Sequence, residues 1–277
     1  MRRSVVGVVA VVAAAAGVAA GDLAGPEAQD RASGRVDLER GKLVDLSHPF
    51  NRETIYWPTA ERFKLTKVAE GETEGGYFYS AYNFAGAEHG GTHLDAPVHF
   101  ARGGAAADEV PLRRLVGAAV TVDVRGQAEG DRDHLISVAD LEGFERENGT
   151  IAPRSIVLLR TGWSSRWPDA RRYLGTAERG AAAVADLHFP GLAPEAAEWL
   201  VRERAVKAVG IDTASIDRGQ STGFEAHRVL GAAAVPVFEN VANLQRLPAD
   251  GFHLVALPMK IEGGSGGPLR VMAVTSP

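Results

Sequence analysis

Three histidines and an aspartate lie within eleven residues of the chain, at His89, His93, Asp95 and His99. Imidazole and carboxylate groups together are ligand types that divalent metals take in proteins. The spacing does not fit one helix face, because Asp95 would lie roughly 200° beyond His93. In an extended chain, side chains alternate, so the four odd-numbered residues point to one side. The cluster therefore predicts a metal site on a strand or loop.

Glycine and proline residues around the cluster also disfavour a helix. Gly90, Gly91 and Pro97 are all poor helix formers. The two glycines additionally allow the backbone to approach a bound ion closely. Pro97 interrupts the alternation before His99, so the spacing does not decide whether His99 points to the same side as the other three residues.

Histidine and carboxylate residues distant in sequence could complete the site, as is common for three-ligand centres. His227 lies in an apolar segment that predicts a short helix, and by itself a helix-borne histidine is more often a surface or capping residue. Glu239 follows the apolar run Val237–Phe238. A buried carboxylate needs a metal, a cation or hydrogen-bond donors. Further candidates lie just upstream: Asp212, Asp217 and Gln220.

Composition sets broad limits on the protein class. The 277 residues are enough for one large domain or two modest ones, and 45% of them are hydrophobic. The net charge of −5 provides no basic surface that would indicate nucleic-acid binding. The chain has no cysteine, which excludes disulfides, thiolate catalysis, iron–sulfur clusters and thiolate zinc sites.

The N-terminus has the pattern of a secretory signal peptide. Arg2 and Arg3 precede an apolar run over 5–20 that ends in small residues. The run falls short of the roughly twenty apolar residues that span a bilayer. We therefore expect a signal peptide over 1–20, a flexible tether over 21–41, and export to the periplasm or medium without stable membrane insertion. The alternatives are an uncleaved anchor or a misplaced start, and the arginine pair is a weak indication of twin-arginine export.

Strand patterns with intervening helices continue from residue 42 to the end of the chain, without a repeat or linker. This predicts a single α/β domain over 42–277. The expected strands lie at 77–84, 116–124, 155–160, 205–211, 253–258 and 269–274. The segment 42–48 is expected to be a short strand that runs into a loop, and the segment 235–244 is expected to begin as a strand. The expected helices lie at 137–142, 194–204 and 224–230, and a tight glycine-rich loop is expected at 263–268.

The run His89-Gly-Gly-Thr-His93-Leu-Asp95-Ala-Pro-Val-His99-Phe resembles the signature of the metal-dependent cyclase family. That family includes bacterial kynurenine formamidases, isatin hydrolases and lactone or polyketide cyclase-like proteins. The resemblance covers roughly residues 42–275 and includes Asp45–His48, Trp57–Pro58, Gly210–Thr213 and the spacing from His227 to Glu239. It implies a single swivelling β/β/α domain with a mixed central sheet, assembled as a homodimer or tetramer.

The resemblance also implies roles for individual residues. His89, His93 and Asp95 would bind the principal metal, and His99 would be the general acid/base. In dinuclear members Asp95 would bridge to a second metal, so one or two Mn²⁺ or Zn²⁺ ions are expected per subunit. His227 and Glu239 match the positions of the second metal's ligands. Trp57 and Gln220 match positions that contact the substrate.

Not every aromatic or imidazole residue is assigned to the site. On its own, the Tyr56–Trp57 pair before a proline is equally typical of a packed loop and of a pocket wall. By resemblance, His48 would lie near the pocket mouth. The remaining histidines are expected to be structural: His134, His188 and His253.

Segments in the second half favour the isatin hydrolase branch of the family: 217–221, 238–244 and 257–268. Arg218 stands where an aromatic residue is expected, which leaves the exact aromatic substrate open. The expected reaction is opening of an isatin-like lactam by metal-bound hydroxide, with His99 moving the proton. The alternatives are N-formylkynurenine hydrolysis, lactone or polyketide cyclase-like hydrolysis, and a non-catalytic exported metal- or ligand-binding protein.

Overall fold

The computed structural model describes residues 37–277. The expected signal peptide over 1–20 and most of the expected tether therefore lie outside the described residues. The first described strand is β1 (Lys42–Asp45). Within 37–277, no helix is both long and apolar enough to cross a lipid bilayer.

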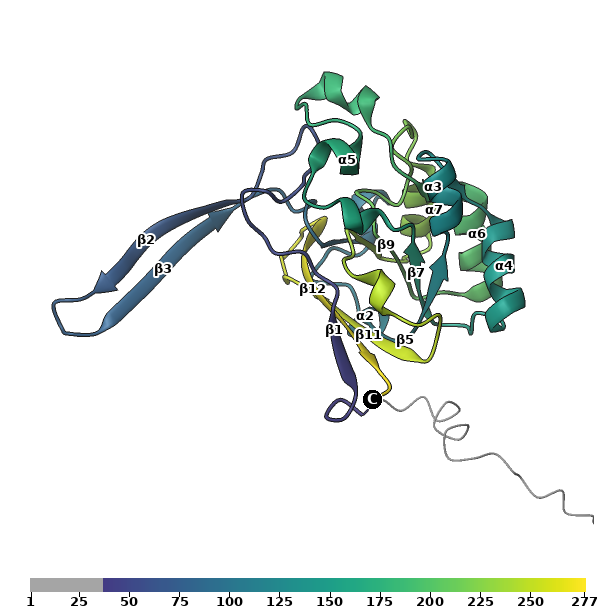
Figure 1. The fold of residues 1–277 in the computed structure, drawn as a ribbon, viewed down its shortest axis with the longest axis horizontal. Helices are drawn as coiled ribbons and strands as arrows, with labels where there is room; N and C mark the ends of the chain where they lie inside the picture. Colours follow the sequence, from purple (N-terminus) through teal and green to yellow (C-terminus); the bar gives the residue numbers. More distant parts are fainter. Residues whose placement is uncertain (1–36) are drawn as a thin grey trace, which may run out of the picture. The chain divides into compact units, whose positions relative to one another are not determined.

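One mixed sheet of eight strands organises these residues (Figure 1). Its strand order is β1-β12-β11-β5-β7-β9-β10-β4. The middle strands β5, β7, β9 and β10 run parallel, and the other pairings are antiparallel. Strand β4 pairs with β12 as well as with β10, so the sheet closes on itself. The bounds are β4 His93–Asp95, β5 Val116–Asp123, β7 Ile156–Arg160, β9 Ala208–Ile211, β10 Val237–Glu239, β11 Phe252–Pro258 and β12 Gly266–Thr275. The prediction of a mixed α/β fold is confirmed.

The parallel strands are apolar without alternation because both of their faces are covered. In β7, Ile156 and Leu158 pack into one hydrophobic core, whereas Val157 and Leu159 pack into the other. The first core lies among β1, β11 and β12, and the second lies under the helices. Burial on both sides explains why this strand could be recognised from a continuous apolar run.

The helices α4 (Val138–Asn148), α6 (Pro194–Arg204) and α7 (Glu225–Ala232) cover one face of the sheet (Figure 1). Ser137 begins α4 with a capping box, in which its side chain and that of Asp140 each accept the other's backbone N–H. The remaining helices are short: α2 Leu112–Leu115, α3 Arg125–Gly130 and α5 Ala170–Leu174.

Two small sheets lie outside the main one. Strands β6 (Leu135–Ile136) and β8 (Gly191–Leu192) form a short parallel pair. Strands β2 (Lys64–Glu72) and β3 (Phe78–Ala85) form an antiparallel hairpin that extends away from the eight-stranded sheet (Figure 1).

Several observed element bounds differ from the expected ones. Strand β12 begins at Gly266 instead of residue 269, because Gly266 and Gly267 pair with β4. Helix α4 continues to Asn148. Strand β10 covers Val237–Glu239, within the segment 235–244 that was expected to begin as a strand. Strand β2 was not predicted, because its exposed sequence KLTKVAEGE has no buried apolar face.

Candidate metal centre

The centre is built on β4, which lies between β10 and β12. The antiparallel register sets His93 opposite Glu239 and Asp95 opposite Val237. On the other side, Gly266 of β12 lies opposite Asp95. A Cβ atom at Gly266 would approach the Leu94 carbonyl oxygen to 2.4 Å, so this close pairing requires glycine. The strand register thus brings Glu239 beside His93 and Asp95, although Glu239 is distant from both in the sequence.

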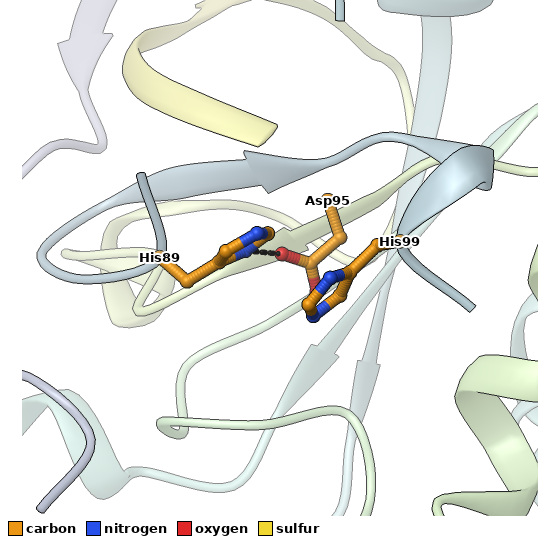
Figure 2. Close-up of side chains that lie close together, drawn as sticks. All are labelled: His89, Asp95 and His99. Atoms are coloured by element: carbon orange, nitrogen blue, oxygen red, sulfur yellow. Dashed lines mark hydrogen bonds and ion pairs between the residues drawn. The ribbon is translucent and has the colours of Figure 1, made fainter. Parts of the chain in front are cut away.

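The expected extended run through the whole cluster is only partly correct. Only His93–Asp95 is a strand. His89 precedes a turn at Gly90–Gly91, where Gly91 has φ +58°, and His99 ends a single 3-10 turn over Pro97–His99. Figure 2 shows that His89 and His99 nevertheless approach Asp95 from either side. Turns, and not strand alternation, bring these side chains together.

Three imidazoles converge on the two carboxylates. His89 Nδ1 lies 2.6 Å from Asp95 Oδ1 (Figure 2). His93 Nε2 lies 3.1 Å from the same oxygen. His227 Nε2 lies 2.9 Å from Asp95 Oδ2 and 3.1 Å from Glu239 Oε1. The structure therefore gathers all five residues predicted as ligands into one cluster, and four of them are buried: His93, Asp95, His227 and Glu239.

Each imidazole is held from outside through its other nitrogen. His93 Nδ1 faces the Gly91 carbonyl oxygen at 3.0 Å, and His227 Nδ1 faces Asp217 Oδ2 at 2.6 Å. Both nitrogens must carry the proton to donate to these oxygens, which leaves each Nε2 directed inward as a possible ligand atom. Such outer hydrogen bonds orient histidine ligands at metal sites.

A serine and a glutamate hold His89 in the same way. The Ser265 hydroxyl donates to Glu88 Oε2 at 2.6 Å, and the Ser265 oxygen lies 2.8 Å from His89 Nε2. Because that hydroxyl proton is already donated, the serine oxygen accepts the Nε2 proton, leaving Nδ1 directed toward Asp95. Sequence reasoning missed this pair, and its only signal was the position of Glu88 beside His89.

The pKa values of the two carboxylates shift in opposite directions. Burial alone would raise the pKa of Asp95, but the charge on His93 and hydrogen bonds with His227 and His89 hold it well below its usual range. Burial, followed by the negative charge of Asp95, raises the pKa of Glu239. A cation between the two carboxylates would relieve their repulsion.

The donor set fits a divalent metal ion. Ligand atoms of His93, Asp95 and Glu239 lie within 4.8 Å of one another, as do those of His89, Asp95 and His99. Asp95 belongs to both groups. The buried His93 Nε2 lies 3.1 Å from Asp95 Oδ1 and 3.5 Å from Glu239 Oε2, but it makes no hydrogen bond of normal geometry within residues 37–277. An inward nitrogen beside two carboxylates suits a metal that takes nitrogen and oxygen ligands.

A cavity of about 290 Å³ opens onto this cluster. Its apolar wall includes Trp57, Phe100 and Phe224, and His99 also lines it. The His99 ring stacks on His89 with centroids 3.8 Å apart. Burial lowers the pKa of His99 to about 4, so the imidazole is neutral at pH 7.

Gln220 has no place in this cavity. It is exposed, and its amide donates to the carbonyl oxygens of Leu187 and Ala185. Arg218, which stands where the resemblance leads us to expect an aromatic residue, also lies outside the cavity lining. Of the two residues expected in the substrate pocket, Trp57 lines the cavity and Gln220 does not.

The other histidines lie away from the cluster. His134 and His188 face Asp140 and Asp133, at 3.3 Å and 2.7 Å. His253 is part of β11. His48, expected near the pocket mouth, lies outside the cavity lining and stacks on Trp167 with centroids 4.1 Å apart.

Residues 44–218 match the model of the Cyclase family, whose description is "Putative cyclase". The chain belongs to this family. Among its members, the isatin hydrolase of Roseibium aggregatum is 32% identical over 221 residues, covering 77% of this chain and 81% of that protein. The kynurenine formamidase of Salinibacter ruber is 29% identical over 238 residues, covering 85% of this chain and 98% of that protein.

Solved cyclase-family structures agree with the fold. Isatin hydrolase A from Labrenzia aggregata, bound to benzyl benzoate, superposes with a TM-score of 0.77 at 32% identity, covering 86% of this chain and 95% of that one. A predicted metal-dependent hydrolase from Bacillus stearothermophilus superposes with a TM-score of 0.62 at 25% identity, covering 84% and 98%.

The Ser265–Glu88 pair leads to a test of metal affinity. We expect Ser265→Ala to weaken metal binding about 10–100-fold, because His89 loses the partner that fixes its ring and tautomer. Isothermal titration of the metal-free protein with Mn²⁺ or Zn²⁺ measures the change. Ser164→Ala, in a turn away from the cluster, is the control. Unchanged affinity in Ser265→Ala would show that His89 needs no outer partner.

His48 makes stability depend on pH. Burial lowers its pKa from 6.5 to about 4, so the unfolded state binds more protons between these values. Stability is therefore fully present above pH 6.5 and is lost as pH falls toward 4, by about 1–2 kcal/mol between pH 7.5 and 5.

Urea unfolding at the two pH values measures this effect in wild type and His48→Phe, which keeps a ring against Trp167. The variant should lose less stability on acidification than wild type. His188→Gln, at an exposed histidine, controls for loss of an imidazole. Equal losses in wild type and His48→Phe would contradict the assignment to His48.

Proposed function

We propose that this chain is a metal-dependent hydrolase that opens a small cyclic amide, with isatin as the leading substrate. The observation that carries the proposal is the position of His99, which lines an aromatic cavity directly beside the Asp95-centred cluster. The 32% identity to an isatin hydrolase supports the choice of a lactam. Hydrolysis would convert the neutral ring into an open-chain carboxylate.

The metal would be held by the converging imidazoles and carboxylates. His89, His93 and Asp95 would hold the principal ion, and a second ion would use Asp95 with His227 and Glu239. Mn²⁺ and Zn²⁺ both accept this nitrogen and oxygen set. When bound, such an ion supplies Lewis acidity, which polarises a carbonyl and lowers the pKa of water to about 7.

His99 would move the proton. As a neutral imidazole it can take a proton from the attacking water as the new C–O bond forms. It then gives that proton to the amide nitrogen as the C–N bond breaks, so the group returns to its starting state. Positioned proton transfer of this kind contributes typically 10²–10⁴-fold to rate.

The cavity wall would select and orient the substrate. Trp57 contacts the ring of Phe224 at a centroid distance of 6.2 Å, and Phe224 contacts that of Phe100 at 5.3 Å. Three neighbouring aromatic rings favour a flat aromatic ligand, because stacked or edge contacts add to apolar burial. They would also exclude bulk water from the reacting amide.

Arylformamidase activity is the second candidate, supported by 29% identity to a kynurenine formamidase over nearly all of that protein's length. The test compares turnover of isatin, N-formylkynurenine and an aromatic lactone by one metal-loaded preparation, before and after chelation. Chelator-sensitive turnover highest on isatin is expected. Higher turnover of N-formylkynurenine or of the lactone would reassign the substrate. A stoichiometric metal with no turnover of any of the three would favour a non-catalytic metal-binding protein.

We also propose that residues 1–20 direct export and are removed, leaving 21–41 as a tether before the domain at 42–277. The basic start, apolar run and small residues support this. N-terminal sequencing of the protein from the periplasm and medium tests the proposal. An intact N-terminus on protein found only in the cytoplasm would overturn it.

A further inference from the structure

Asn240 lies directly after Glu239, where β10 ends, and its backbone is left-handed. Its φ is +52°, in a region that asparagine adopts more readily than most other residues do. The residue is buried, with 2% of its surface exposed. Its two backbone groups and both ends of its side-chain amide have hydrogen-bond partners. A buried polar group that is fully satisfied holds its surroundings in one arrangement.

The backbone of Asn240 connects the end of β10 to two other segments. Its N–H donates to the Thr213 carbonyl oxygen at 2.9 Å, in the loop that follows β9. Its own carbonyl oxygen accepts from the Thr92 hydroxyl at 2.7 Å. Thr92 lies directly before His93, so this second bond fixes the end of β10 against the start of β4.

The side chain of Asn240 reaches the same turn at its preceding residue. Its Nδ2 donates to the Gly91 carbonyl oxygen at 2.8 Å, and the same oxygen accepts the Nδ1 proton of His93 at 3.0 Å. A carbonyl oxygen has two lone pairs and can accept both donors. Asn240 Nδ2 also lies 3.5 Å from His93 Nδ1. The amide therefore contacts both the imidazole and the carbonyl group that orients it.

Tyr173 of α5 lies at the other end of the amide. Its buried hydroxyl lies 2.9 Å from Asn240 Oδ1 and 2.9 Å from the Asp212 carbonyl oxygen. Both neighbours are acceptors, so the hydroxyl donates its single proton to one or the other. The reversed amide would set Asn240 Oδ1 against the Gly91 carbonyl oxygen, which is also an acceptor. The hydrogen-bond partners thus agree on one orientation of the amide.

We propose that Asn240, itself held by Tyr173, is a positioning residue that fixes His93 and Glu239 relative to each other in the metal centre. It acts on His93 through the Gly91 carbonyl oxygen, and on Glu239 through the backbone bonds at the end of β10. The proposal rests on the proposed function, because it requires that these residues hold a metal ion. Without the amide, the Gly91 carbonyl oxygen would lose one of its two donors, and the His93 ring would be less firmly held.

Titration of the metal-free full chain with Co²⁺ tests the proposal, because the visible absorption of bound Co²⁺ depends on the number and arrangement of its ligands. Asn240→Gly removes the amide and accepts the left-handed backbone without strain. We expect it to bind Co²⁺ about 10–100-fold more weakly than wild type, with an altered absorption spectrum at saturation.

Asn243→Gly is the matched control. Asn243 also has a positive φ, and its side chain donates to a backbone carbonyl oxygen, that of Asp45, outside the metal cluster. This variant should keep the wild-type affinity and spectrum. An equal loss in Asn243→Gly would assign the effect to removal of any such amide and would overturn the proposal.

A double-mutant cycle tests the part played by Tyr173. Tyr173→Phe keeps the ring in the core and should weaken Co²⁺ binding, by less than Asn240→Gly does. Added to Asn240→Gly, it should cause no further loss, because Tyr173 acts through the amide. Tyr173→Phe also tests the proposal by itself if Asn240→Gly does not fold.

The outcomes separate this proposal from the proposed function. Wild-type affinity with an unchanged spectrum in Asn240→Gly, or in Tyr173→Phe where only that variant folds, would overturn the positioning role alone. Losses that multiply in the double variant would contradict action of Tyr173 through Asn240. A wild type that binds no Co²⁺ would overturn the metal-dependent function together with this proposal.

Discussion

Replacing His99 with alanine is expected to lower kcat for isatin hydrolysis about 10²–10⁴-fold. The side chain lines the cavity beside the metal cluster, where it can reach both the attacking water and the leaving nitrogen. KM should change much less than kcat, because a proton-transfer group acts mainly in the transition state. Steady-state kinetics with the metal-loaded variant measures both.

Metal content separates the two roles open to His99. Its ligand atom also lies in a three-residue group with His89 and Asp95, so it could bind an ion instead of moving a proton. A proton-transfer role predicts that His99→Ala keeps the wild-type metal stoichiometry. Loss of metal in the variant would make His99 a ligand, and wild-type turnover with metal bound would exclude a proton-transfer role. His134→Ala, outside the cluster, is the matched control.

Replacing Asp95 with asparagine is expected to remove metal binding and reduce turnover to background. Asp95 is shared by both three-residue groups, and its oxygens lie 2.6–3.1 Å from three imidazoles. The substitution keeps the side chain's size but removes the charge and one acceptor oxygen. Elemental analysis after dialysis should find metal in wild type and none in the variant.

Thermal unfolding provides an activity-independent measure of the same loss. Metal at 100 times its dissociation constant should stabilise wild type by about 2.7 kcal/mol, through preferential binding to the folded state. That shift should vanish in Asp95→Asn and persist in Asp133→Asn, at a carboxylate that faces His188 away from the cluster. A full metal-induced shift in Asp95→Asn would refute its role as the shared ligand.

The local part of the site could be predicted from the sequence because its residues are neighbours in the chain. His89, His93, Asp95 and His99 span eleven residues, so any compact backbone keeps them close. Their residue types identify nitrogen and oxygen metal chemistry without knowledge of the fold. The helix at 194–204 and the strand at 155–160 were also well predicted, because a first-turn proline and a continuous apolar run are local signals.

The hairpin and Gln220 show where local signals fail. Strand β2 has no buried face, so its pairing with β3 leaves no hydrophobic period in its own sequence. Gln220 follows residues that resemble a functional segment, yet its amide is directed to backbone carbonyls. Side-chain direction depends on the path of the loop, which composition does not reveal.

The sequence by itself thus determined the mixed α/β class, and it predicted a metal site of nitrogen and oxygen ligands and the proton-moving candidate. Only the tertiary structure decided how the centre is completed. Glu239 reaches His93 because β10 pairs with β4, and Ser265 reaches His89 because β12 pairs with β4 on its other side. These contacts arise from hydrogen-bond register between strands more than a hundred residues apart in the chain. Register depends on how the whole sheet closes, so no single segment of sequence contains it.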